Sequence, residues 1–159
     1  KIYQDYPDSR LILIGDNTRV LQMQRVNNIL SKMPYSDRII FTGQLDRKSV
    51  IEKINSAYCL VLARPDNIQA KYGFPTKLGE YLSTGKPVIV TSVGDIPLFL
   101  RDGEIAYIAK PDNVDAFANK LNECLSDSIK ASFIGKKGKE LVYGEFNYLE
   151  VTKNIVYSM

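Results

Sequence analysis

Residues 73–91 of the chain have the sequence GFPTKLGEYLSTGKPVIVT, and the architecture of the chain can be inferred outward from them. The first part of this segment predicts a helix over residues 76–84. Gly85 ends that helix, because glycine adopts the left-handed conformation of a helix C-terminus at little cost. Pro87 prevents the helix from continuing. The apolar residues 88–91 then predict a buried strand, so the segment is a helix–strand unit of the kind that builds α/β proteins.

On both sides of this segment, short apolar runs alternate with runs of helical periodicity. Strands are predicted at residues 11–14, 38–42, 58–63 and 105–109, and helices at residues 18–32, 46–55 and from Asp112 or Asn113 onward. We also expect an irregular loop at residues 64–75, one helical turn at residues 96–100, and two helices broken near Gly144 in residues 128–159. Continuously apolar strands that are each followed by a helix are typical of a parallel sheet covered on both faces. We therefore predict one α/β domain over residues 1–159, a Rossmann-like doubly wound parallel sheet of about five strands with helices on both faces.

The composition excludes several classes of protein. The 159 residues include no His, and 21 Lys and Arg stand against 18 Asp and Glu. Without His there is no Ser-His-Asp catalysis and no His-ligated zinc. The charges are interspersed, so no nucleic-acid partner is expected. No apolar run reaches the length of a membrane span and no signal peptide opens the chain, so we expect a cytoplasmic protein.

The two cysteines are too few for a disulfide framework, and we expect both to be reduced. Cys59 lies in an apolar run and is predicted to be buried in a strand. Cys124 lies in a helical pattern and is predicted to be half-buried.

The start of the helix at residue 76 is the best candidate for a binding site. In doubly wound sheets, ligands bind outside the carboxyl ends of the strands. The amides of Thr76, Lys77 and Leu78 are predicted to point out of the helix start, where the helix dipole favours an anion. Lys77 adds a full positive charge, and Gly73 allows a ligand to approach the backbone closely. The pattern is compatible with a phosphate site, although many helices begin with Pro-Thr and bind nothing.

Two charged residues near this helix start have alternative interpretations. Glu80 lies one turn further along, where its carboxylate is suited to accept hydrogen bonds from the two hydroxyls of a ribose. Alternatively, Glu80 pairs with Lys77 on a solvated helix face. Arg64, at the end of the predicted third strand, either reaches a phosphate or is an exposed loop residue.

The quoted segment resembles the donor-binding signature of the group 1 (retaining, GT-B fold) glycosyltransferases. The specific part is Pro-x-Lys-Leu-x-Glu-Tyr-x-x-x-Gly-Lys-Pro-Val, which begins at Pro75. Residues 94–97 and 102–104 resemble the next landmarks of that family, and the resemblance covers about residues 10–126. One departure is Tyr72, which stands where the family commonly has a first glutamate that addresses the donor sugar, so the identity of the sugar stays open.

The resemblance implies a fragment: the C-terminal donor-binding half of a glycosyltransferase, without its N-terminal acceptor domain and its first strand. A nucleotide-diphosphate-sugar would bind as substrate, with no cofactor. No metal is expected, because no Asp-x-Asp cluster is present. Glu80 takes the place of the glutamate that holds the ribose hydroxyls, and Gln44 and Leu45 are placed near the base, while the catalytic residues are not identified. The predicted substrate-binding residues are Gln44, Leu45, Arg64, Gly73, Phe74, Pro75, Thr76, Lys77, Leu78 and Glu80.

The resemblance also implies partners. The acceptor would be a glycan or a lipid-linked glycan precursor, bound by the absent domain, and a peripheral location at the inner face of the membrane is compatible with it. Absence of the first strand would expose unpaired strand edges, from which we expect a rearranged sheet edge or a homodimer. Two other functions stay open at this point, a nucleotide-sugar epimerase of GT-B fold and a non-catalytic nucleotide-binding module.

Overall fold

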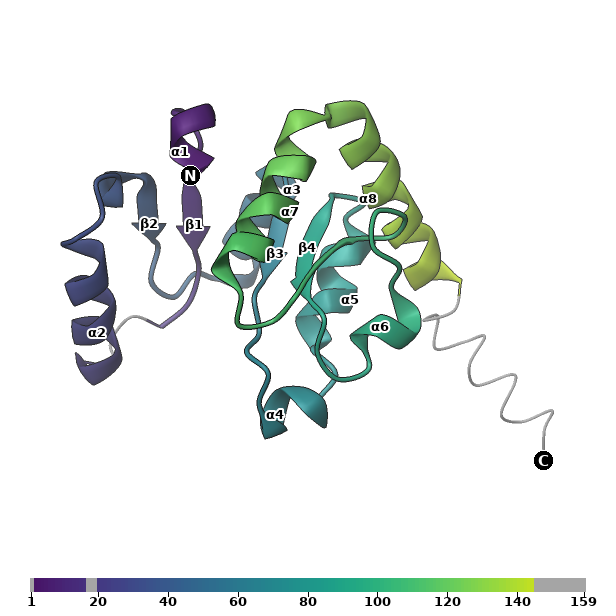
Figure 1. Ribbon diagram of the computed structural model, residues 1–159, viewed down its shortest axis with the longest axis horizontal. Helices are drawn as coiled ribbons and strands as arrows, with labels where there is room; N and C mark the ends of the chain where they lie inside the picture. Colours follow the sequence, from purple (N-terminus) through teal and green to yellow (C-terminus); the bar gives the residue numbers. More distant parts are fainter. Residues whose placement is uncertain (1, 17–19, 145–159) are drawn as a thin grey trace. The chain divides into compact units, whose positions relative to one another are not determined.

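The computed structural model describes residues 2–16 and 20–144 (Figure 1). The chain divides into two compact units, Lys1–Lys53 and Ile54–Met159, which are described separately.

The first unit is built on two parallel strands. β1 (Leu11–Leu13) pairs with β2 (Ile39–Phe41), with Leu11 opposite Ile39. The helical elements that accompany them are α1 (Ile2–Asp5), α2 (Val20–Leu30), the 3₁₀ turn η1 (Ser36–Arg38) and α3 (Arg47–Ser56), whose last turn extends into the second unit. The short elements α1 and η1 were not predicted from the sequence.

The second unit is a three-stranded parallel sheet with helices. The strands β3 (Leu60–Leu62), β4 (Val88–Thr91) and β5 (Tyr107–Ala109) are adjacent in that order. The helices are α4 (Ile68–Lys71), α5 (Thr76–Ser83), α6 (Ile96–Phe99), α7 (Val114–Ser126) and α8 (Ser128–Tyr143).

Two hydrophobic cores lie on opposite faces of this sheet. Val88 and Val90 point into one core, together with Leu78 and Leu82 of α5. Ile89 points into the other core, which contains residues of α7 and of the first half of α8. Figure 1 shows α7 in front of the sheet and α5 behind it. The prediction of helices on both faces of a parallel sheet is therefore confirmed.

Local signals in the sequence set most helix boundaries. Asp46, the predicted cap of α3, accepts hydrogen bonds from the Ser49 amide (2.9 Å) and hydroxyl (2.8 Å), which lower the pKa of its carboxyl group. The Asn113 side chain caps α7 by accepting from the Ala116 amide at 2.8 Å. Gly85 ends α5 with a φ of 75°, as expected.

The strand count of five is confirmed for the described residues, but they form two sheets and not one. The pair β1–β2 belongs to the first unit and the sheet β3–β4–β5 to the second, and the strands of each sheet run parallel. The expected absence of the first strand of the family domain stays a prediction. The expected homodimer stays a prediction.

Two further expectations need correction. The loop predicted at residues 64–75 contains the helical turn α4, capped by the Asn67 side chain, which accepts from the Ala70 amide. The burial of the cysteines is reversed: Cys124 is fully buried and Cys59, which precedes β3, is half-buried. Neither forms a disulfide, and a hydrogen bond to Cys59, together with burial, raises the pKa of the Cys124 thiol. The second helix predicted beyond Gly144 lies outside the described residues.

Two glycines of α8 let this helix pack closely against the end of α5. A Cβ atom at Gly135 would collide with the Gly85 carbonyl oxygen and lie 2.8 Å from the Pro87 nitrogen. A Cβ atom at Gly138 would lie 2.7 Å from a methyl group of Leu82. The neighbours of Gly135 are backbone atoms, which cannot rotate away, so the contact requires glycine.

We expect Gly135→Ala to destabilise the protein by about 2 kcal/mol, because the added methyl group overpacks a backbone contact. Gly79→Ala is the matched control, since a Cβ atom at Gly79 in α5 has nothing within 4 Å. The control should stabilise the protein by about 0.5–1 kcal/mol through the lower entropy of the unfolded chain. Urea unfolding followed by circular dichroism measures both changes, and equal midpoints for the two variants would contradict the packing argument.

Candidate functional site

The candidate site lies where β3 and β4 end, at the first turn of α5. Pro75 precedes the helix in an extended conformation, and its carbonyl oxygen accepts a hydrogen bond from the Leu78 amide at 2.9 Å. Within the described residues, the amides of Thr76 and Lys77 have no hydrogen-bond acceptor. Unpaired amides at a helix start favour an anion. The site thus offers two backbone donors.

Leu78 has a different role from the one predicted. Its amide is bound to Pro75 and its side chain has 0% exposure, inside the core between α5 and the sheet. Leu78 therefore anchors the helix start and does not contact a ligand with its side chain. Tyr81, one turn after Leu78 in α5, also packs against this core. Burial is the main cause that raises the pKa of the Tyr81 hydroxyl, and the negative charge of Glu80 raises it further.

Arg64 holds the loop that leads into the site. Its guanidinium group donates to the Gly73 carbonyl at 2.6 Å and to the Gln69 carbonyl at 3.4 Å. Its backbone is fixed by the Thr91 hydroxyl, which accepts from the Arg64 amide and donates to the Arg64 carbonyl, both at 2.8 Å. The guanidinium group is therefore not that of a free loop residue, and its contact to a phosphate stays a prediction. The guanidinium group holds the backbone of the loop at Gln69 and Gly73.

The short helix α4 is seated against the turn that follows β4. Gly94 has a φ of 55°, and a Cβ atom there would lie 2.6 Å from the Ala70 carbonyl oxygen and 3.0 Å from that of Lys71. Ala70 itself is buried, with 2% exposure. This close approach fixes the residues that enter α5. A glycine after a strand is the one sequence signal that points to it.

The charged side chains of the site are open to solvent. Lys77 and Glu80 are both exposed, and no ion pair joins them in the part of the chain that the structure describes. The alternative in which Glu80 forms an ion pair with Lys77 is therefore not observed. A free ammonium group and a free carboxylate one helical turn apart can bind the anionic part and the hydroxyl groups of one ligand.

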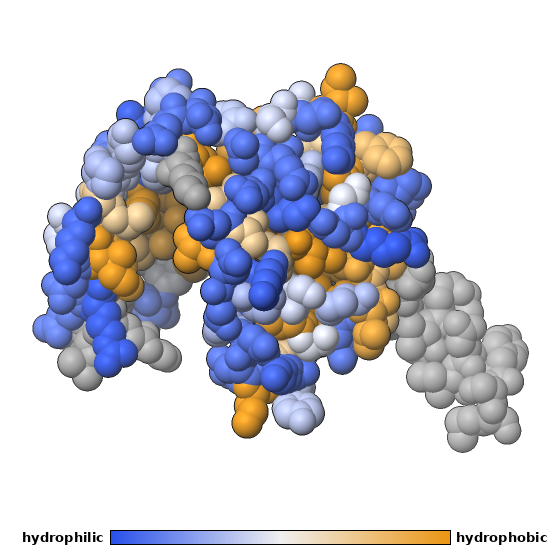
Figure 2. Space-filling model, in the orientation of Figure 1, coloured by the Kyte–Doolittle hydropathy of each residue, from blue (hydrophilic) through white to orange (hydrophobic). Residues whose placement is uncertain are grey.

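Apolar side chains are exposed beside this helix start. Phe74 packs edge-on against Phe99, with ring centroids 5.8 Å apart, and Tyr72 is 89% exposed. Ile68 on α4 and Leu98 on α6 are each 77% exposed. Figure 2 shows apolar surface over these two helices of the second unit.

The predicted residues Gln44 and Leu45 belong to the first unit. They follow β2 after Gly43, which has a φ of 71°. Gln44 is exposed and Leu45 is half-buried. The remaining predicted residues, Arg64, Gly73, Phe74, Pro75, Thr76, Lys77, Leu78 and Glu80, lie together in the second unit.

Two further properties concern ions and membranes. Among the described residues, no three Cys, Asp or Glu side chains are grouped so as to hold a metal ion. None of the helices in residues 2–16 and 20–144 is long and apolar enough to cross a membrane.

Comparison with known proteins assigns the family. The model of the family described as Glycosyl transferases group 1 matches residues 1–127. The chain belongs to this family. This finding confirms the resemblance noted in residues 73–91, which are within the matched range.

Individual proteins are similar to this chain in sequence or in fold. The N-acetyl-alpha-D-glucosaminyl L-malate synthase of Bacillus anthracis is 25% identical over 139 residues, which are 87% of this chain and 34% of the relative. The Anabaena protein HepE, solved in complex with UDP-glucose, has a TM-score of 0.81 at 18% identity, over 96% of this chain and 41% of that chain. A C-terminal domain of a group 1 glycosyltransferase from Francisella tularensis has a TM-score of 0.77 at 24% identity, over 91% of this chain and 73% of that one. The structural matches show a shared fold, and the chain spans about a third of the length of the curated relative.

The clamp formed by Arg64 can be tested without a ligand. We expect Arg64→Met to accelerate hydrogen exchange of the Lys71 and Tyr72 amides about tenfold, because a charge-assisted bond to the loop backbone is lost. Arg101→Met is the matched control, because Arg101 is exposed and pairs only with Glu104 in the described residues. Unchanged exchange at both amides in Arg64→Met would show that the guanidinium group does not hold the loop.

Proposed function

We propose that this chain is the donor-binding part of a glycosyltransferase that moves a sugar from a nucleoside diphosphate to an acceptor. The observation that carries the proposal is the start of α5, where the free amides of Thr76 and Lys77, the Lys77 ammonium group and the unpaired Glu80 carboxylate lie together at the carboxyl edge of a parallel sheet. Family membership supports the same conclusion.

In this proposal each residue has a distinct role. The two amides and Lys77 bind the diphosphate and stabilise the charge that grows on it as the sugar leaves. Glu80 accepts hydrogen bonds from the ribose hydroxyls. Arg64 and Gly73 position the loop, while Phe74 and Pro75 shape the entrance of the site.

The base and the acceptor are bound by other parts of the protein. Gln44 and Leu45, after β2, are the candidates for contacts to the base. The acceptor, a glycan or lipid-linked glycan, would bind to a domain outside this chain, which spans only about a third of its curated relative. In a retaining transfer, an oxygen of the leaving diphosphate takes the proton of the acceptor hydroxyl, so the absence of His from this chain is no obstacle. The proposed setting is cytoplasmic.

Uridine diphosphate is the first ligand to test. HepE, which shares the fold, has been solved with UDP and with UDP-glucose. No observation favours an epimerase or a non-catalytic nucleotide-binding module over a glycosyltransferase.

We expect Glu80→Gln to weaken the binding of the preferred nucleoside diphosphate about ten- to a hundredfold, because the charge that strengthens the bonds to both ribose hydroxyls is lost. The stability should change little, since Gln and Glu have similar helix propensities. Glu52→Gln, another exposed helical glutamate, is the matched control. Isothermal titration with the diphosphate and with its 2′,3′-dideoxy analogue measures the effect.

The wild-type protein should distinguish these two ligands, and Glu80→Gln should do so far less. Equal affinities of both proteins for both ligands would leave Glu80 as surface charge and remove it from the donor site.

We also expect the purified 159-residue chain to bind donor without transferring sugar. Transfer requires donor and acceptor to be aligned between two domains, and the chain covers only about a third of its curated relative. An assay with UDP-sugars and a panel of glycan acceptors tests this. Sustained turnover by the chain alone would contradict it.

A further inference from the structure

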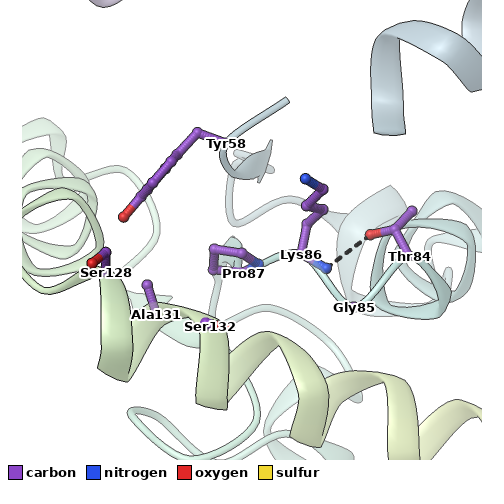
Figure 3. A pocket seen from close by; sticks show the side chains of 8 residues that line it. All are labelled: Tyr58, Thr84, Gly85, Lys86, Pro87, Ser128, Ala131 and Ser132. Atoms are coloured by element: carbon purple, nitrogen blue, oxygen red, sulfur yellow. Dashed lines mark hydrogen bonds between the residues drawn. The ribbon is translucent and has the colours of Figure 1, made fainter. Parts of the chain in front are cut away.

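A cavity of about 300 Å³ lies within the second unit, at the edge of the sheet opposite to the candidate donor site. Its walls come from the segments before β3 and β4 and from the first two turns of α8 (Figure 3). Helix α5 connects the two places, because its first residue belongs to the donor site and Gly85, which follows its last turn, lines the cavity. The two sites are therefore separate, about 12 Å apart along the helix axis. The residues that give the cavity its chemistry are Tyr58, Lys86, Pro87, Ser128, Ala131 and Ser132.

The backbone beneath the cavity is fixed. The Thr84 hydroxyl accepts from the Lys86 amide at 3.0 Å and donates to the Tyr81 carbonyl at 2.6 Å. Gly135 packs directly on the backbone of Gly85 and Pro87. The cavity is thus preformed, which lowers the entropic cost of binding.

One end of the cavity is positively charged. The ammonium group of Lys86 forms no ion pair with any residue that the structure describes. A lysine ammonium group is a strong partner for a phosphate.

The other end of the cavity carries hydroxyl groups. Ser128 and Ser132 lie one turn apart on α8 and both line the cavity. The carboxylate of Asp127, the residue before them, is engaged by the Lys130 amide at 2.9 Å. This end is therefore suited to neutral hydroxyl groups of a ligand, and an anion is favoured at the Lys86 end.

Tyr58 and Pro87 line the cavity between the two ends. Figure 3 shows the Tyr58 ring reaching toward Ser128, with Pro87 between Tyr58 and Lys86. Tyr58 is 48% exposed, and its hydroxyl donates to the Cys124 carbonyl at 3.4 Å, which holds the ring in place. An aromatic ring beside a proline packs well on the C–H face of a pyranose ring, because both surfaces are flat and weakly polar.

We propose that this cavity binds a monosaccharide phosphate. The phosphate lies at Lys86, the sugar ring lies on Tyr58 and Pro87, and the sugar hydroxyls contact Ser128 and Ser132. The proposal does not depend on the donor site, since the two share no binding residue.

The test uses the ¹⁵N-labelled chain and three ligands, namely glucose 6-phosphate, glucose and inorganic phosphate. Glucose 6-phosphate should shift the amide resonances of Gly85, Lys86 and Ser128 in a saturable way. Its affinity should be at least about tenfold higher than that of phosphate or of glucose, because only the sugar phosphate fills both ends of the cavity.

Three variants locate the binding. Lys86→Met should lower the affinity for glucose 6-phosphate about tenfold or more, because the positive charge is lost. Ser132→Leu should abolish binding, because the larger side chain fills the cavity from an exposed helix position that tolerates the change. Lys110→Met removes an exposed lysine that does not line the cavity, and this variant should bind glucose 6-phosphate as tightly as the wild type does.

Three results would overturn the proposal. They are equal affinity in Lys86→Met and wild type, equal affinity for phosphate and glucose 6-phosphate, and resonance shifts at Thr76 and Lys77 without shifts around the cavity. Failure of this test leaves the donor site untouched, because the Glu80 titrations use a different ligand and a different edge of the sheet.

Discussion

Burial of β4 on both faces is the constraint on which the second unit depends. All four residues of the strand are buried, with Val88 and Val90 facing one core and Ile89 the other. A strand in this position requires neighbours on both edges and helices on both faces, since none of its surface can remain in water. The chain meets this requirement with β3 and β5 at the edges, α5 on one face and α7 on the other. The glycines of α8 then allow that helix to close over the end of α5.

The same strand positions the candidate site. Thr91, its last residue, is the buried polar side chain that exchanges two hydrogen bonds with the backbone of Arg64. These two bonds tie the carboxyl end of β3 to that of β4. They also fix the backbone from which the Arg64 guanidinium group reaches the loop. Gly94, just beyond the strand, allows the backbone of α4 to pack closely against the turn that follows β4. The free amides at the start of α5 are thus held by contacts that all begin at the carboxyl end of β4.

Much of this architecture could be predicted from local sequence signals. The strand at residues 88–91, the cap at Asp46 and the helix end at Gly85 depend on a few adjacent residues, and the structure confirms them. The features that could not be predicted depend on residues far apart in the chain. Arg64 became a backbone clamp because Gly73 lies within its reach, and Cys124 became fully buried because α7 packs on Tyr107 and Ile89. The division into two sheets could not be predicted either, because the pattern of apolar residues does not encode which strands pair.

We infer that the start of α5 binds the diphosphate of a nucleotide-sugar. Amide chemical shifts of the ¹⁵N-labelled chain test it most directly, in titrations with UDP, with GDP and with the matching nucleosides that lack phosphate. We expect one diphosphate to produce its largest shifts at Thr76 and Lys77, and we expect its nucleoside not to do so. Diphosphates that leave both amides unmoved, or that shift them no more than the nucleosides do, would contradict it.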